Sequence, residues 1–348
     1  MNHSGTQNRV VLLALAAMLL FLLRPASVGA QTRIRLATLL SQGSSQYHAL
    51  EEMGQQWKTT TGGALTLTIY PGGTMGGEEE TIRRLRLGQL QAATLSAAGL
   101  SSIDPSVGAI EKIPMLYHSL DEMEYVCSKM QPDLEKRLEQ KGFVALAWTD
   151  AGWIHIVSRQ PYTTPEEFKA KKSKIFVTSS DLDEAAVLNS LGFQAVPLEW
   201  SDVLISLQTG LVDTVPVTPF YALASQFDLA AKNLLEVNYV PLVGATVMTK
   251  RVWDALTPDQ QEKVLKAAAD AGKKIRAQSR AESQEALEAM KKRGLQVRPV
   301  PQELEDDWRR FVEAVYPKMR GKIVPADAFD KALSLVAEYR ASHKTGQP

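Results

Sequence analysis

The chain has 348 residues, which is long enough for two domains of ordinary size with a hydrophobic core in each. Its 39 Lys and Arg residues equal its 39 Asp and Glu residues in number, so the chain lacks the overall basic charge that is typical of nucleic-acid-binding proteins. Hydrophobic residues make up 45%, which is ordinary for a soluble globular protein, and the single cysteine excludes an internal disulfide.

Residues 1–30 have the pattern of a secretory signal peptide. Arg9 precedes an uninterrupted apolar run at 10–23, and small side chains follow up to Ala30. This order predicts cleavage after Ala30 and a periplasmic location. The alternative is a membrane anchor, but the run of 14 residues is shorter than the roughly 20 that a spanning helix needs.

The next segment predicts strands that alternate with helices. Apolar and polar residues alternate in RIRLAT and ALTLTIY, as is typical of strands, and glycines end both intervening helices. The predicted elements are a strand at 33–38, a helix at 45–60, a strand at 64–70, a helix at 78–88 and a strand at 92–96. This order predicts a parallel sheet with crossover helices.

The middle of the chain repeats that alternation. Thr164 and Glu167 form a capping box around Pro165, which marks the start of a helix. The other predicted elements are strands at 143–149, 153–158, 174–178, 194–198 and 212–217, and helices at 181–191 and 200–209.

Residues 257–293 predict one long helix. Thr257 and Gln260 form a second capping box, apolar residues recur near one face, and Gly294 ends the helix. A helix of this length spans on the order of 50 Å, more than the width of one domain, so we expect it to bridge two domains. Two α/β domains, an export signal and a bridging helix are typical of a periplasmic binding protein, which closes on its ligand by a hinge.

Four stretches resemble the solute-binding proteins of TRAP transporters, the DctP-like family. They follow one another in the order and at the spacing of the family, and LQTGLVD at 207–213 is the most specific part. The stretches are LTLTIYPGGTMGGEEETIRRLRLGQLQAA, VGAIEKIPMLY, TTPEEFKAKKSKIFV and LGFQAVPLEWSDVLISLQTGLVDTV.

The resemblance implies an α/β, two-lobed periplasmic solute-binding protein fold with a long helix bridging both lobes. It places one lobe at 32–153 plus 243–281 and the other at 154–242 plus 282–340. It implies no enzyme activity and no cofactor. The expected partners are a small-molecule ligand and the membrane subunits of a TRAP-type permease, with no nucleic acid. The alternative is a carrier or sensor of the same fold that serves no such permease.

Several positions depart from the family pattern. The resemblance aligns Phe176 and Ile154 with arginines that hold organic acids, and Val217 with an asparagine. Leu40 aligns with a polar residue and Ser96 with an acidic one, whereas Trp200 keeps the aromatic character of its position. Because a buried carboxylate without a partner is strongly disfavoured, we expect a relatively apolar or aromatic-faced ligand.

The predicted ligand-binding residues are Leu40, Ser96, Trp153, Ile154, Phe176, Ser179, Trp200, Val217, Phe220 and Tyr221. Two alternatives stay open. These residues could pack the lobes around a site that has lost its function, or an organic acid could be held by a displaced cation from Lys172, Lys174 or His155.

Motifs for other chemistry are missing from the sequence. There is no Gly-x-Ser-x-Gly elbow, and the glycine-rich segment 72–77 lacks the Lys-Ser/Thr of a phosphate-binding loop. The five histidines show no metal-ligand spacing. We therefore expect neither a catalytic centre nor a metal site.

Overall fold

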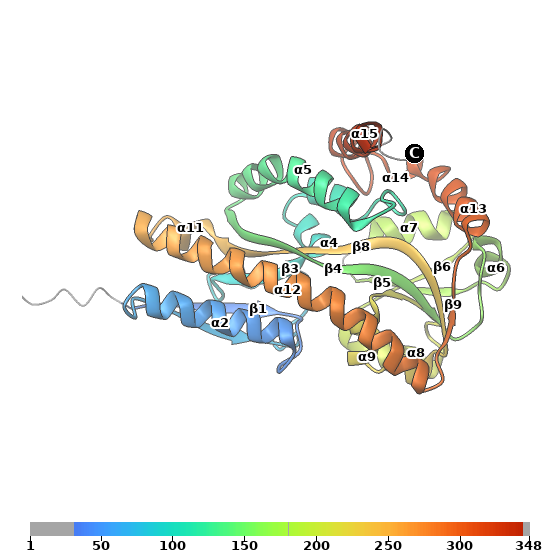
Figure 1. Ribbon diagram of the computed structural model, residues 1–348, viewed down its shortest axis with the longest axis horizontal. Coiled ribbons are helices and arrows are strands. Elements are labelled where there is room, and N and C mark those ends of the chain that lie inside the picture. Colours follow the sequence, from blue (N-terminus) through green and yellow to red (C-terminus); the bar gives the residue numbers. More distant parts are fainter. Residues whose placement is uncertain (1–30, 180, 344–348) are drawn as a thin grey trace, which may run out of the picture.

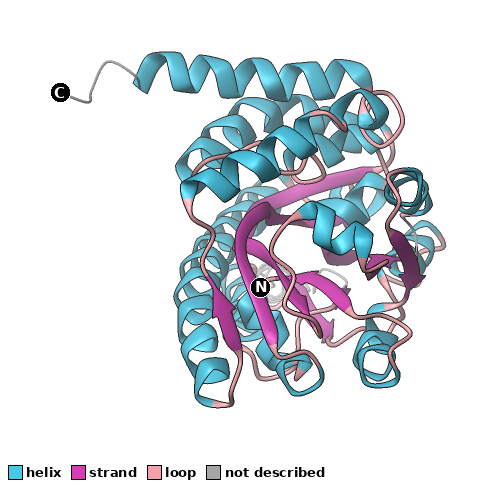
Figure 2. Ribbon diagram, turned by 90° about the vertical axis from the view of Figure 1, so that its right-hand side faces the viewer, coloured by secondary structure: helices cyan, strands magenta, loops and turns pink. Residues whose placement is uncertain are grey.

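The computed structural model describes residues 31–179 and 181–343, so the predicted signal peptide at 1–30 lies outside the described residues. The described chain folds around a nine-stranded sheet with helices on both sides (Figures 1 and 2). Its strand order is β2-β1-β3-β8-β4-β7-β5-β6, and β9 pairs with β8. The strands are β1 Thr32–Thr38, β2 Leu65–Tyr70, β3 Ala92–Ser96, β4 Phe143–Ser158, β5 Lys174–Thr178, β6 Gln194–Leu198, β7 Thr214–Val217, β8 Asn233–Thr249 and β9 Gln296–Arg298. The predicted α/β class is confirmed.

One half of the sheet contains β1, β2 and β3, which pair in parallel. The helices between them are α2 (Ser45–Thr60) and α3 (Glu78–Arg86). The Ser44 hydroxyl caps α2 by accepting the Tyr47 backbone N–H, and Leu50 and Trp57 bury the inner face of the helix. The alternation predicted for residues 33–96 is confirmed.

The other half contains β5, β6 and β7, and β5 pairs in parallel with both of its neighbours. The predicted capping box begins α6 (Pro165–Ala170), and α7 (Leu182–Ser190) connects β5 to β6. The segment predicted as one helix at 200–209 is a short 3₁₀ turn, η2 (Trp200–Asp202), followed by α8 (Val203–Thr209).

Two long antiparallel strands, β4 and β8, run through both halves. The pairing register shifts between Asp150 and Trp153, and Gly152 between them has φ of 79°. This irregularity interrupts the apolar pattern, which is why the sequence predicts two strands, at 143–149 and 153–158. The structure has one continuous strand there.

The long helix α12 (Pro258–Lys292) also reaches both halves, as predicted. Its first part packs Val264 and Ile275 in a core cluster with α2, β1 and β2. Its last part packs Leu287 and Met290 in a cluster with β7 and α8. In Figure 1 it is the orange helix that crosses the molecule.

The remaining helices cover the ends and one face of the molecule. They are α4 Ala97–Ser101, η1 Pro105–Ile110, α5 Leu120–Gln140, α9 Pro219–Ala224, α10 Phe227–Ala230, α11 Lys250–Trp253, α13 Gln302–Glu313, α14 Tyr316–Met319 and α15 Ala326–His343. The C-terminal helix α15 contacts α5 and η1, beside the half that holds β1 to β3. Among the described residues, no helix combines the length and apolar character needed to cross a membrane.

Candidate functional site

A cavity of about 350 Å³ lies between the two halves of the sheet. This volume is within the range of small-molecule sites. Its wall includes Leu40 and Ser96 from the half with β1 to β3, and Phe176 and Trp200 from the other half. Residues far apart in the sequence therefore meet around one space.

Seven of the ten predicted ligand-binding residues line this cavity. They are Leu40, Ser96, Ile154, Phe176, Trp200, Val217 and Tyr221. These residues come together because the ends of β3, β5, β6 and β7 and the β1–α2 turn all border the cavity.

The other three predicted residues do not contribute to the described cavity wall. Trp153 precedes Ile154 on β4, so its side chain lies on the opposite face of the strand and packs against the cluster around α5. The Ser179 hydroxyl donates to Glu199. The Phe220 ring lies edge-on to Tyr221, with ring centroids 5.3 Å apart.

One side of the cavity is aromatic. The Trp200 ring lies edge-on to Phe176 and Tyr221, with centroid separations of 6.0 and 6.3 Å. Phe227 supports Trp200 from behind at 5.3 Å. Phe176 is only 7% exposed, and contacts of this kind hold large rings in fixed orientations.

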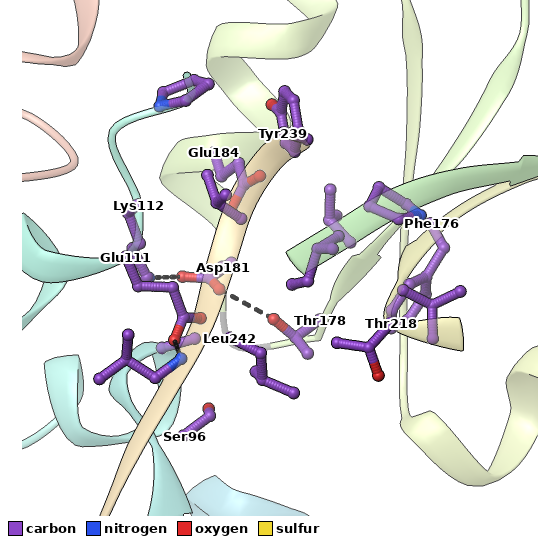
Figure 3. A pocket seen from close by; sticks show the side chains of 18 of the residues that line it. Ser96, Glu111, Lys112, Phe176, Thr178, Asp181, Glu184, Thr218, Tyr239 and Leu242 are labelled. Carbon is purple, nitrogen blue, oxygen red and sulfur yellow. Dashed lines mark hydrogen bonds and ion pairs between the residues drawn. The ribbon is translucent and has the colours of Figure 1, made fainter. Parts of the chain in front are cut away.

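The opposite side of the cavity carries charged groups that the sequence analysis did not select. Figure 3 shows Glu111, Lys112, Asp181 and Glu184 grouped together, away from Phe176 and Thr218. Lys112 pairs with Asp181, which also accepts a hydrogen bond from the Thr178 hydroxyl at 2.8 Å. The Glu111–Lys112 pair inside the apolar segment VGAIEKIPMLY was the available signal for this cluster.

Glu78 lies beside Ser96 at the start of α3. Ser96 donates its backbone N–H and its hydroxyl to the Glu78 carboxyl, each at 2.6 Å. Burial raises the pKa of Glu78, although these two hydrogen bonds oppose the shift. The Glu78 carboxyl group thus lies against Ser96 in the cavity wall.

Burial also changes the protonation of two carboxyl groups near Lys112. The Val243 backbone N–H donates to Glu111 at 2.9 Å, yet burial raises the pKa of Glu111 to about 8. For Glu184, burial and the neighbouring charge of Asp181 raise the pKa to about 7, against the opposing effect of Lys112.

The cations considered as substitutes for arginine lie elsewhere. Lys174 Nζ donates to the Gly210 carbonyl at 3.0 Å, and the buried His155 Nδ1 lies 2.9 Å from the Val237 carbonyl oxygen. Neither these two residues nor Lys172 belongs to the described cavity wall, where Lys112 is the only Lys, Arg or His. Burial lowers the pKa of His155, which favours its neutral form.

The described residues offer no metal centre, since no group of three or more His, Cys, Asp or Glu residues is arranged to hold an ion. The wall has aromatic and aliphatic surface on one side and carboxyl groups on the other. It can enclose a small molecule by shape and charge.

Comparison with known proteins gives matches over most of the chain. The family model of bacterial extracellular solute-binding proteins, family 7 (DctP), matches residues 36–322. The chain is 26% identical to the C4-dicarboxylate-binding periplasmic protein of Rhodobacter capsulatus over 278 residues, which cover 78% of this chain and 81% of that protein.

Solved structures share the fold. A sugar acid binding protein of Advenella mimigardefordensis in complex with galactonate has a TM-score of 0.82 and 21% identity, covering 89% of this chain and 99% of that one. A TRAP periplasmic solute-binding protein of Ochrobactrum anthropi has a TM-score of 0.78 and 25% identity, covering 91% of this chain and 98% of that one. The family-model match at residues 36–322 spans most of the strands and turns that surround the cavity.

Proposed function

The chain belongs to family 7 of the bacterial extracellular solute-binding proteins, and from that premise we propose that it delivers a largely apolar or aromatic-faced solute to a TRAP-type membrane permease. Solute binding itself follows from the family. What we propose is the class of ligand and the permease partner. Capture and release of a solute need no chemical step.

The cavity wall supports an apolar ligand. No arginine is part of the described wall, whereas Phe176, Trp200 and Tyr221 form a continuous aromatic surface. A planar guanidinium is the group best suited to hold a carboxylate by two hydrogen bonds. The absence of arginine from the described wall is the observation that carries this part of the proposal.

We propose that the two halves of the sheet are the two lobes, with boundaries at 32–153 plus 243–281 and at 154–242 plus 282–340. The irregular pairing of β4 and β8 between Asp150 and Trp153 lies near the boundary and suits a hinge. The segment 282–340 includes part of α15, whose contacts are with α5 and η1 in the other lobe. That helix therefore ties the second lobe back to the first.

The proposed place of action is the periplasm, reached through a signal peptide at residues 1–30. Membership in an extracellular family supports this location. The alternative, a carrier or sensor without a permease, predicts that deleting the gene leaves solute uptake by intact cells unchanged. Loss of uptake on deletion supports the permease function.

Native mass spectrometry of protein purified from its own host tests the ligand class. We expect one retained molecule per chain, released on unfolding, with an apolar or aromatic skeleton. A retained dicarboxylate or sugar acid that rebinds the refolded protein would show that the ligand class is wrong while leaving solute binding intact.

A further inference from the structure

The charges that line the cavity are unbalanced. Its described wall contains one cationic side chain, Lys112, and five carboxyl groups. These carboxyl groups belong to Glu78, Glu111, Asp150, Asp181 and Glu184.

Two of the five carboxyl groups have cationic partners within the protein. Arg276 and Arg280 on α12 contact Asp150 at 3.0 and 2.9 Å, and Lys112 pairs with Asp181. Among the described residues, no cation lies within ion-pair distance of Glu78, Glu111 or Glu184. The cavity therefore has three carboxyl groups without a cationic partner, and burial raises the pKa of each of them.

Glu111 is the most enclosed of these three groups. Its side chain belongs to a residue only 6% exposed, and its Oε2 accepts the Val243 backbone N–H. No described residue donates a hydrogen bond to its Oε1, although Glu111 lines the cavity. This oxygen is open to the cavity and is not sealed inside the protein, so water or the donor group of a ligand can reach it. A ligand in the cavity is placed to supply that group.

Glu184 offers a second acceptor near the same place. No hydrogen bond or ion pair joins its carboxyl group to another described residue. Tyr239 lies beside it in the wall, as Figure 3 shows. An aromatic face next to a carboxylate is a favourable environment for an ammonium group, because the ring attracts the cation.

Beyond this acidic side, the cavity wall is mostly apolar, although threonines such as Thr94, Thr149 and Thr218 also belong to it. Aliphatic and aromatic side chains of α7, α13 and their neighbours enclose that part, among them Val187, Leu188, Phe311, Val312 and Val315. A ligand whose polar head lies at Glu111 and Glu184 can thus place a hydrocarbon body in the rest of the cavity.

We infer that the solute is an organic cation, with an ammonium-type head bound by Glu111 and Glu184 and an apolar or aromatic body in the rest of the cavity. This inference rests on the proposed function, since it names the ligand class of the same site. Net attraction arises because the head neutralises carboxyl groups that have no cation of their own.

Three compounds with one carbon skeleton test the charge of the ligand. They are 4-phenylbutylamine, 4-phenylbutan-1-ol and 4-phenylbutyrate, titrated calorimetrically into the mature protein at pH 8. We expect the amine to bind at least tenfold more tightly than the alcohol, and the butyrate most weakly. An amine that binds no better than the alcohol, or that does not bind, overturns the inference. So does tighter binding of the butyrate.

Isosteric variants locate the head group. Glu111→Gln and Glu184→Gln should each reduce the preference for amine over alcohol at least fivefold, whereas Glu288→Gln, an exposed residue paired with Lys291, should leave it unchanged. A preference retained in both cavity variants contradicts the assigned head-group site. Thermal unfolding of each variant confirms that it is folded.

The outcome separates this inference from the proposed function. If a neutral apolar solute is retained from the host and the amine fails to bind, solute binding stands and only the cation is wrong. Calcium or magnesium titrated in place of the amine provides a further check. Saturable binding of either ion at the cavity carboxyl groups, competing with the amine, would assign the site to a metal and overturn the organic ligand.

Discussion

The carboxyl groups of the cavity are sensitive to pH in a range where ordinary carboxyl groups are not. Burial, together with the smaller effects of nearby Glu78 and Asp181, raises the pKa of Glu111 to about 8, against the opposing effects of the Val243 N–H and Lys112. Burial and the nearby charge of Asp181 likewise raise the pKa of Glu184 to about 7. Both groups are therefore largely protonated at pH 6 and ionised to a greater extent at pH 8.

This difference predicts that an organic cation binds more tightly at higher pH. An alkylammonium group, with a pKa near that of lysine at about 10.4, stays charged throughout this range, so only the protein changes its protonation. At pH 6 the amine must displace protons from both groups, whereas at pH 8 Glu184 is mostly ionised and Glu111 is ionised in about half of the molecules. We expect the affinity for 4-phenylbutylamine to rise at least tenfold between pH 6 and pH 8, measured by calorimetry.

The neutral alcohol is the control for this titration, because its affinity does not require ionised carboxyl groups. Calorimetry in two buffers with different ionisation enthalpies should also detect proton release on binding of the amine at pH 7. Amine affinity that is constant or falls with rising pH contradicts ionised carboxyl groups as the binding partners.

At the level of elements, α12 is fastened to β4 by charged contacts as well as by its apolar face. Arg280 donates to both oxygens of the buried Asp150 at 2.9 Å and to Glu124 on α5 at 2.6 Å. Arg276 makes a second contact with Asp150 at 3.0 Å. The helix is thus fixed at the point where β4 changes register.

We expect Arg280→Met to lower the free energy of unfolding by about 1–3 kcal/mol, because a buried carboxylate loses its bidentate partner while Arg276 remains. Urea denaturation measures the effect. The control is Arg83→Met, since Arg83 pairs with Glu80 on the surface, where solvent screens the pair and little loss of stability is expected. Equal effects of the two substitutions would show that the buried contact adds no stability.

The elements that sequence patterns predicted are those with local signals. Capping boxes marked the starts of α6 and α12, and alternating residues marked β1 and β2. The strand β8 was not predicted, because its 17 residues include Pro241 and pass from one half of the sheet to the other. The docking of α15 on α5 depends on contacts between distant residues, which no local pattern records.

The residues of the site also fall into those that the sequence could predict and those that it could not. Resemblance to aligned family positions selected Phe176, Trp200 and Val217, which do meet around the cavity. It did not select Glu111 or Glu184, because an acidic residue in a turn or in the first turn of a helix is ordinarily a solvated one. Only packing shows that these two carboxyl groups line the cavity.

At the scale of the whole molecule, the two proposed lobes touch across the cavity in this structure. Lys112 from one lobe pairs with Asp181 from the other. At a second point, Gly77 at the start of α3 faces Glu199, and a Cβ atom at Gly77 would lie 2.4 Å from Oε2 at the free end of this side chain, so that a large side chain at Gly77 would have to push Glu199 aside. Opening of the lobes at a hinge in β4 and β8 would break these contacts and widen the access of solute to the cavity.

A larger side chain at Gly77 should therefore hinder closure without preventing folding. The backbone there has φ of −65°, which any residue adopts, so Gly77→Leu introduces no backbone strain. We expect at least tenfold weaker binding of the solute recovered from the host. Small-angle scattering should show that ligand reduces the radius of gyration of the wild type but not that of the variant.

Ala255→Leu, an exposed position outside the cavity wall, is the control and should behave as the wild type does. If Gly77→Leu binds and contracts normally, the lobes do not close through this contact. If saturating ligand leaves the radius of the wild type unchanged, the free protein already has the closed form.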